Sequence, residues 1–532
     1  MMAGEKITCG GTPEGSDALL IAREAEKKQC AVIHIARDDK RLVQMRAALA
    51  FFAPQLMVLD FPAWDCLAYD RISPNAAISA ARMATLAGLS QGVKAPFVLL
   101  TTLKAATQKI PAREVLESAS FTARVGERVN ETALRDFLVR MGFSQTSTVM
   151  EPGDYALRGG IVDIFPPTGG DGGQPVRLDF FGDILDGARH FDPATQRTTQ
   201  QLDKIELAPV SEVILDEAAI TRFRQNYRIE FGAAGTDDPL YEHVSAGMKY
   251  AGVEHWLPFF HDRLETLFDY LPDATIALDD QVNAMIRSRW DMIADQYETR
   301  TIAMKDRNRI DTIYKPVPPA KMYLDADAFD VSVQDSRVLQ LSPLQQAPGP
   351  GLIDAGGRIG RNFAPERQIE NVSLFSALKD HIQVKRLTGQ VVIASWSEGA
   401  RERLGGLMAD EGLTGITEIK DFRDIPEGEG GVFLAVWPLE AGFESPGLTV
   451  ISEQDVLGDR LIRAPKRKRR AENFLTEAQS LSPGDLVVHV DHGVGRYNGL
   501  ETVTAMSAPH DCIALEYAGG DRLFLPVENI EL

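Results

Sequence analysis

The sequence has few cysteines, no long apolar run and a deficit of positive charge. Four cysteines in 532 residues lie far apart without metal-ligand spacing, which excludes a disulfide framework and predicts the reduced thiols of a cytoplasmic protein. No apolar run approaches the ~18 residues of a membrane span, and the first residues show no signal-peptide pattern, so no membrane partner is expected. The net charge of −20 argues against a general nucleic-acid-binding surface.

The length and the apolar pattern indicate several α/β domains. At roughly 150 residues each, the chain holds about three or four domains. Short apolar runs at Ala31–Ala36, Leu56–Asp60 and Phe97–Thr101 are separated by helical patterns such as Asp17–Lys28 and Ala76–Leu89. Strands that alternate with helices predict a parallel sheet in this part of the chain.

The first loop has the glycines of a phosphate-binding loop but lacks its lysine. Gly10 and Gly15 have the spacing of the G-x-x-x-x-G-K-[S/T] motif. Ser16 stands where the lysine would meet the phosphates, and Asp17 stands where a hydroxyl would bind magnesium. We therefore expect a degenerate nucleotide site, with no catalytic residue, no metal ion and no cofactor, although Asp17 also suits an ordinary helix N-terminus.

An acidic pair, Asp279 and Asp280, follows an apolar run in the second part of the same domain. The segment resembles one in UvrB whose acidic pair serves magnesium and water, although the Glu, Ser and His that complete that box are missing here. Because the phosphate-binding loop is already degenerate, we interpret the pair as an acidic strand end that caps the next helix.

The stretch Met150–Phe181 predicts a small antiparallel sheet. Gly160–Phe165 is an apolar run between Gly and Pro, and Val176–Phe181 alternates apolar and charged residues. A Gly-rich loop between two such runs indicates an antiparallel pair of strands. Arg158 precedes the first strand and Arg177 lies within the second, and the charge pattern alone is also typical of two ordinary surface arginines.

The pattern RGG…DIFP…RLDFF in this stretch resembles domain 2 of UvrB and, more closely, the matching domain of the transcription-repair coupling factors. The resemblance implies that Arg158, Arg177 and Phe181 contact UvrA. An arginine fork binds carboxylates and an exposed aromatic ring fills a pocket, so we expect an acidic patch on the partner. The segment Asp65–Pro74 is similar to both families, but the DNA-clamping hairpin that follows it in UvrB is missing.

The middle of the chain predicts a linker and a second α/β unit. Gln345–Gly351 cannot continue a helix, and Gly356–Arg361 is expected to be flexible and basic. Residues 365–457 alternate strand and helix patterns without a nucleophile or metal motif. The basic run Lys466–Arg470 is expected to be either a solvated linker or a contact to the DNA backbone, and both readings stay open.

The last segment predicts a tightly turned β-sheet because glycines and β-branched residues alternate closely over Leu481–Leu500. This pattern resembles the polymerase-interacting domain shared by coupling factors and CarD-type regulators. The resemblance implies a Tudor/SH3-like β-barrel that contacts the RNA polymerase beta subunit through Leu500, Glu501, Thr502 and Val503. Addition of a strand at an exposed edge would suit this contact. His489 and His492 without a third ligand do not predict a metal site.

The expected fold class is therefore multidomain α/β, with a small docking domain inserted into a larger domain. The expected domains are a degenerate helicase-like (RecA-like) parallel-sheet domain at 1–115 and 207–345, an inserted α+β UvrA-docking domain at 116–206, a second small α/β domain at 346–460, a basic linker at 461–477 and the barrel at 478–532.

This order resembles the N-terminal portion of a coupling factor, or a truncated gene product, without the two motor lobes. The implied function is transcription-coupled DNA repair, in which this stretch recruits UvrA and tethers to RNA polymerase. ATP, magnesium and double-stranded DNA are expected to bind only the missing motor lobes. The alternatives are a CarD-like transcription regulator that acts through the barrel alone and a UvrB-like damage-verifying ATPase, which the degenerate loop disfavours.

Overall fold

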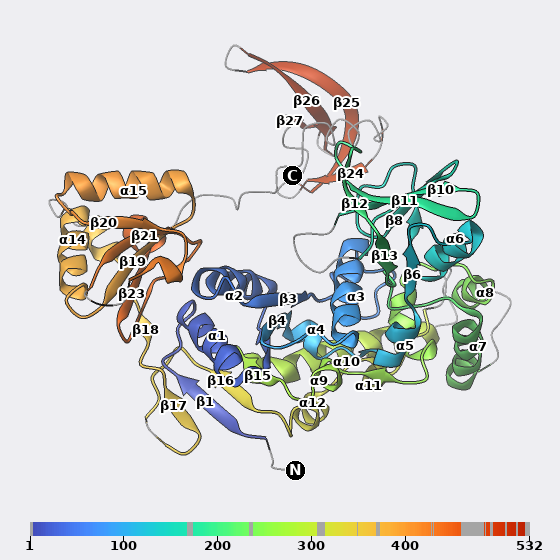
Figure 1. Ribbon diagram of the computed structural model, residues 1–532, viewed down its shortest axis with the longest axis horizontal. Helices are drawn as coiled ribbons and strands as arrows, with labels where there is room; N and C mark the ends of the chain where they lie inside the picture. The colour runs from blue at the N-terminus through green and yellow to red at the C-terminus, as the bar shows by residue number, and fades with distance from the viewer. Residues whose placement is uncertain are drawn as a thin grey trace. The chain divides into compact units, whose positions relative to one another are not determined.

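The computed structural model divides the chain into two compact units, Met1–Gly458 and Asp459–Leu532 (Figure 1). The residues that the structure describes are 4–167, 174–232, 238–305, 314–347, 349–368, 373–426, 428, 430–458, 484, 486–489, 493–505, 508–517 and 520–526. In the described part of the chain, no helix is long and apolar enough to cross a membrane.

The largest sheet of the first unit has seven strands, and every pairing in it is parallel. In spatial order the strands are β17 (Leu352–Asp354), β1 (Lys6–Gly10), β16 (Val338–Leu341), β15 (Thr275–Leu278), β2 (Ala31–Ala36), β4 (Phe97–Thr102) and β3 (Met57–Phe61). The predicted parallel sheet is confirmed. Its central strand β2 is buried at every residue, as expected for a strand with both faces covered.

Helices cover both faces of this sheet (Figure 1). Helices α1 (Ser16–Lys28) and α2 (Asp39–Phe52) pack on one face through residues such as Ile21 and Leu49. Helices α3 (Ala76–Ser90), α10 (Val282–Lys305) and α12 (Ala326–Ser332) pack on the other face. The loop from β1 to α1 therefore lies at one edge of a fully covered sheet.

A six-stranded sheet forms a separate layer of the first unit. In spatial order its strands are β12 (Thr198–Leu202), β11 (Ile184–Phe191), β10 (Val176–Phe181), β9 (Ile161–Ile164), β8 (Asp154–Arg158) and β7 (Ser144–Gln145). All its pairings are antiparallel except β7 with β8, which confirms the predicted antiparallel pair of β9 and β10. Helix α6 (Glu131–Arg140) fills the inner face with Leu134, Phe137 and Leu138. The outer face is covered in part by a small buried cluster that contains Ala156 and Phe191.

A buried ion pair ties the six-stranded sheet to the larger one. Arg82 on α3 donates from Nε to Glu212 Oε1 at 2.6 Å, and both side chains are fully buried. Glu212 follows strand β13 (Lys204–Leu207), which leads out of the six-stranded sheet region. Trp64 Nε1 donates to the same carboxylate at 3.0 Å. Because a buried charge without a partner is costly, removal of either residue of this pair would be strongly destabilising.

A second α/β layer with a mixed sheet completes the first unit. In spatial order its strands are β18 (Arg358–Ile359), β22 (Phe443–Ser445), β23 (Leu448–Ser452), β19 (Gln390–Ser395), β21 (Val432–Val436) and β20 (Ile416–Ile419). Helices α14 (Leu374–Lys385) and α15 (Glu398–Asp410) pack on it.

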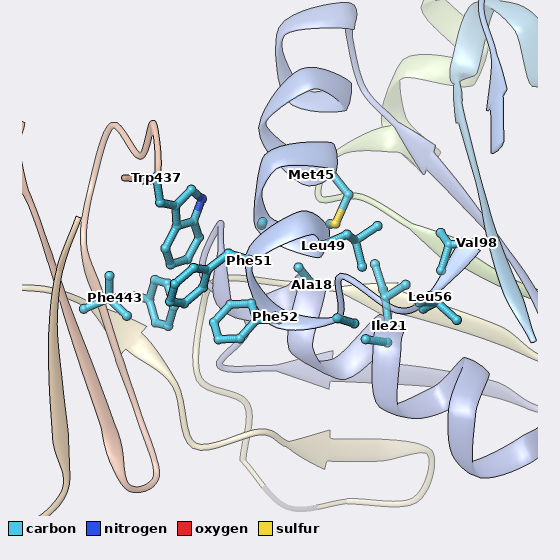
Figure 2. Packing of buried hydrophobic residues seen from close by; sticks show 14 of the residues in the cluster. Ala18, Ile21, Met45, Leu49, Phe51, Phe52, Leu56, Val98, Trp437 and Phe443 are labelled. Carbon is cyan, nitrogen blue, oxygen red and sulfur yellow. The ribbon is translucent and has the colours of Figure 1, made fainter. Parts of the chain in front are cut away.

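An aromatic cluster joins this second layer to helix α2 (Figure 2). Phe51 stacks on Trp437 with ring centroids 4.6 Å apart. Phe52 meets the same indole edge-on at 5.4 Å and lies 6.4 Å from Phe443. These rings belong to one buried cluster that also contains residues of the seven-stranded sheet, so the two layers share a core.

The expected flexible linker at Gly356–Arg361 is wrong. Arg358–Ile359 forms strand β18, which pairs antiparallel with Phe443–Glu444, and the preceding β17 pairs with β1. Gly357 N donates to Gly11 O at 2.9 Å, and a Cβ on Gly357 would lie 2.5 Å from that oxygen. The glycines here permit close approach of two backbones instead of providing flexibility.

The second unit contains a four-stranded antiparallel sheet. Its strands are β24 (Leu486–His489), β25 (Gly493–Ala505), β26 (Ala508–Glu516) and β27 (Arg522–Pro526). One face packs Tyr497, Ile513 and Leu515 together, which agrees with the predicted β-sheet. The basic run Lys466–Arg470 and His492 lie outside the described residues.

We predict that Trp437→Ala destabilises both α/β layers together. The change leaves a cavity between Phe51 and Phe443, and loss of a buried indole typically costs about 3–5 kcal/mol of unfolding free energy. Urea unfolding with hydrogen-exchange mass spectrometry measures it, and Leu387→Ala is the control because that side chain is 82% exposed. Loss of protection in β19 and β21 with α2 unaffected would contradict a shared core.

Candidate functional site

The degenerate phosphate-binding loop is occupied by a side chain of the protein itself. The loop leaves β1 at Gly10 and enters α1 at Ser16. The buried Asp17 carboxylate accepts hydrogen bonds from Gly15 N at 3.0 Å and Ala18 N at 2.9 Å through Oδ1. Backbone N–H groups at a helix N-terminus are the groups that hold phosphate in active loops, so Asp17 takes the place of an anion.

An arginine lies between the two acidic positions of this site. Arg41 on α2 donates from Nη2 to Asp17 Oδ2 and from Nε to Asp279 Oδ1, the latter at 3.2 Å. Burial raises the pKa of Asp17 to about 6, although the Arg41 charge acts in the opposite direction. Burial also opposes the charge of Arg41, but the two carboxylates outweigh it and raise the arginine pKa. A fixed cation thus stands between the carboxylates, where an ATPase would need a metal ion.

Asp279, at the end of β15, forms ion pairs instead of capping the following helix. Asp279 was predicted to cap the following helix, but its carboxylate pairs with Arg41 and with Arg37 Nη1, the latter at 3.3 Å. Arg37 in turn donates to Glu14 Oε1 at 2.6 Å. Asp280 follows as a half-buried residue. The carboxylate at Asp279 is thereby committed to structural ion pairs.

Neighbouring segments also cover the loop. A Cβ on Gly15 would lie 2.8 Å from Phe443 Cε1, and a Cβ on Gly10 would lie 2.6 Å from Gln346 Cγ. Ser16 Oγ donates to Pro13 O at 2.8 Å instead of facing outward. In the described part of the chain, no cluster of His, Cys, Asp and Glu could hold a metal ion. Side chains of Asp17, Phe443 and Gln346 therefore lie around the loop.

The three residues expected to contact UvrA lie on one face of the six-stranded sheet. Arg158 on β8 lies opposite Ile161 on β9, and Ile161 lies opposite Asp179 on β10. Asp179 is two residues from Arg177 and two residues from Phe181 along the same strand. Because side chains alternate along a strand, Arg177, Phe181 and Arg158 all point to the outer face. Phe181 is 79% exposed, and Arg158 is exposed and donates from Nη2 to Ser147 O at 2.6 Å.

Arg177 is held much more tightly than the other two residues. Its Nε and Nη2 donate to Asp163 Oδ1 and Oδ2 at 2.7 and 2.9 Å, and its Nη1 donates to Gln196 O at 3.2 Å. The guanidinium also lies 4.8 Å from the Phe191 ring centroid. The hydrogen bonds to Asp163 raise the pKa of Arg177. Its planar fork is thus already paired inside the domain.

Arg189 and Asp179 of this face were not predicted from the sequence. Arg189 on β11 is the cross-strand neighbour of Arg177 and forms an ion pair with Asp179. The identity of the residues opposite Arg189 depends on strand register, which the sequence alone does not fix.

The residues expected to contact RNA polymerase lie on the long strand β25. The backbone of Leu500–Val503 pairs with Ile513–His510 of β26. On the other side of β25, strand β24 pairs only with Gly493–Arg496. Within the described residues, the free side of β25 at 500–503 therefore has no strand partner.

Comparisons with known proteins fit both surfaces. The UvrB interaction domain family matches residues 121–213, which include Arg158, Arg177 and Phe181. The CarD-like/TRCF RID domain family matches residues 481–532, which include Leu500–Val503.

The chain is also similar to curated proteins over its whole length. It is 30% identical to the transcription-repair-coupling factor of Escherichia coli over 100% of this chain and 45% of the relative. It is 30% identical to that of Haemophilus influenzae over 98% of this chain and 44% of the relative, and 24% identical to that of Staphylococcus aureus over 99% and 44%. The chain is thus a relative of the transcription-repair-coupling factors that spans about 45% of their length and carries a UvrB interaction domain and a CarD-like/TRCF RID domain.

Proposed function

We propose that this chain is an adaptor in transcription-coupled DNA repair that docks UvrA through one surface and the RNA polymerase beta subunit through another. The observation that carries the proposal is the outer face of the six-stranded sheet, which carries the exposed Phe181 on β10 and the exposed Arg158 on β8 within the matched UvrB interaction domain. With these partners, the proposed place of action is the cytoplasm.

The UvrA surface combines an aromatic anchor with arginines, a composition that is typical of binding hot spots. Phe181 supplies apolar area. Arg158 supplies a cation, and the structure records no ion pair between it and any carboxylate of the described residues. Arg177 contributes through its position on the same face, with its guanidinium plane fixed by Asp163. The proposed partner surface is acidic and has an apolar socket.

The polymerase surface is proposed to be the unpaired side of β25 at Leu500–Val503. An extended segment of the beta subunit could add to this edge by backbone hydrogen bonds, which is a recurring mode of recognition. We further propose that the four strands of this unit belong to the Tudor/SH3-like barrel that the family resemblance implies. The match to the CarD-like/TRCF RID family supports both proposals.

The loop at Gly10–Asp17 is proposed to bind no nucleotide, because Asp17 and Arg41 replace the phosphate and the cation within the protein. Movement on double-stranded DNA with ATP and magnesium, which the resemblance implies for the whole protein, is proposed to need parts of the relatives that this chain does not match. The match at 481–532 also supports a second candidate, a CarD-like regulator that works without UvrA.

The first prediction concerns UvrA. Arg158→Ala/Phe181→Ala should weaken binding of the full chain by about tenfold or more, because it removes an aromatic and an arginine anchor. Titration against purified UvrA measures the change. Arg135→Ala/Val139→Ala on α6 is the matched control, since both residues are exposed on the helix that covers the inner face. Failure of the wild-type chain to bind UvrA would leave the CarD-like regulator as the supported function.

Arg177 needs a separate variant. Arg177→Ala alone would leave the buried Asp163 carboxylate unpaired, which costs about 3 kcal/mol or more of stability in such pairs. Asp163→Leu/Arg177→Met removes both charges together. It distinguishes a loss of UvrA binding from a loss of folding.

The second prediction concerns RNA polymerase. A chain that ends at Gly458 keeps the first compact unit and lacks the second. It should lose binding to the beta subunit and keep UvrA affinity within about twofold, because the two surfaces belong to separate units. Pull-down and titration with each partner test this, and retention of polymerase binding by the shortened chain would contradict it.

The third prediction concerns nucleotide. Calorimetric titration with Mg-ATP should give no binding by the wild-type chain, and Ser16→Lys/Asp17→Thr should not restore it, because Phe443 lies against Gly15. The double variant should also be less stable, since Arg41 then keeps only one carboxylate. Binding of Mg-ATP by either protein would overturn the assignment of a closed site.

A further inference from the structure

The tip of the β10–β11 hairpin exposes an apolar pair that the domain itself does not cover. A two-residue turn with Gly182 at φ +58° joins the strands, and Phe181 lies directly opposite Ile184. Phe181 is 79% exposed and Ile184 is 40% exposed. Directly opposed residues of an antiparallel pair have adjacent side chains, so the two form one exposed aromatic–aliphatic pair.

Arg128 extends this pair from a third segment of the chain. An isolated antiparallel bridge pairs Arg128 with Ile184. The flanking backbone hydrogen bonds run from Leu185 N to Glu127 O at 3.0 Å and from Val129 N to Asp183 O at 2.8 Å. This pattern makes Arg128 and Ile184 a non-hydrogen-bonded pair, in which opposed side chains lie closest. Arg128 therefore stands on the same face as Ile184 and Phe181.

The charges of this face are distributed unevenly. Two of its four arginines are neutralised within the domain: Arg177 pairs with Asp163, and Arg189 pairs with Asp179. For Arg128 and Arg158, the structure records no ion pair with any residue that it describes. Both residues are exposed, so this face carries two arginines without a recorded ion pair, and Arg128 is the one that lies next to the apolar pair.

The acidic residues near Arg128 form no recorded ion pair with it: Asp183 and Asp186, which flank Ile184, are exposed. Glu127 precedes it in the bridge and so points to the opposite face, where its Oε2 accepts a hydrogen bond from Arg124 N at 3.3 Å. The long stem of an arginine can pack along apolar surface while its head meets a carboxylate. An apolar pair next to an arginine suits a partner that has an apolar pocket with an acidic rim.

We propose that Phe181, Ile184 and Arg128 form one anchor row, in which Ile184 and Arg128 are binding residues for an acidic-rimmed apolar socket on UvrA. The inference rests on the proposed UvrA docking and adds two residues to it. Arg158 lies beyond the row and supplies a second cation to the same acidic surface. The row combines an aromatic ring, an aliphatic side chain and a guanidinium, which together can be desolvated at the centre of an interface.

The test is a titration of UvrA with single variants of the full chain. Ile184→Ala and Arg128→Ala should each weaken binding by about fivefold to tenfold, and Arg128→Glu should weaken it further because it places like charge against the acidic rim. The matched controls are Val139→Ala and Arg135→Ala on α6, which should change affinity less than about twofold. Unfolding curves that match the wild type establish that each variant is folded.

The outcomes separate this inference from the broader proposal. Wild-type binding that Phe181→Ala weakens, with Ile184 and Arg128 variants behaving like the controls, would overturn the anchor row and leave UvrA docking intact. No wild-type binding would overturn the docking itself. Self-association of the chain that Phe181→Ala abolishes would show that the row is an interface between copies, and would also overturn the inference. Additive losses in the Arg128→Ala/Ile184→Ala double variant would contradict a single row, since neighbouring anchors couple.

Discussion

The first unit depends on one buried cation held between two carboxylates. Arg41 comes from α2, Asp17 from α1 and Asp279 from the end of β15, so one guanidinium joins three elements at the edge of the sheet. Removal of Arg41 would leave two buried carboxylates without their shared cation, which costs several kcal/mol, and removal of either carboxylate would leave Arg41 with a single buried partner. Phe443 lies against Gly15 of the loop that leads into α1.

The side chains that fill the loop at Gly10–Asp17 bear on whether a nucleotide could drive motion of the first unit. In nucleotide-driven proteins, domains move because a ligand binds two states unequally. In the proposed function no ligand acts in this way, because Asp17 and Arg41 fill the loop. The aromatic contacts between α2 and Trp437 join the adjacent layer to the same core. The candidate docking residues Arg177 and Phe181 lie on a strand that is paired on both sides, which lowers the cost of ordering them on binding.

Local patterns predicted the elements well, and contacts between distant segments were not predictable. The strand Ala31–Ala36 follows from a run of apolar residues, and α3 follows from the helical pattern at Ala76–Leu89. The role of Asp279 was mistaken because its partner Arg41 lies 238 residues away. The linker at Gly356–Arg361 was mistaken because glycine permits both flexible chain and close backbone contact. At the candidate site, the sequence indicated which side chains face outward, whereas their neighbours followed from register.

The proposed function gives the chain two docking surfaces, one on each compact unit. The most direct test is sedimentation of UvrA, this chain and the RNA polymerase beta subunit together. If the surfaces act independently, one complex contains all three proteins, and the affinity for each partner is unchanged by saturation with the other. Displacement of UvrA by the beta subunit, or of the beta subunit by UvrA, would contradict it.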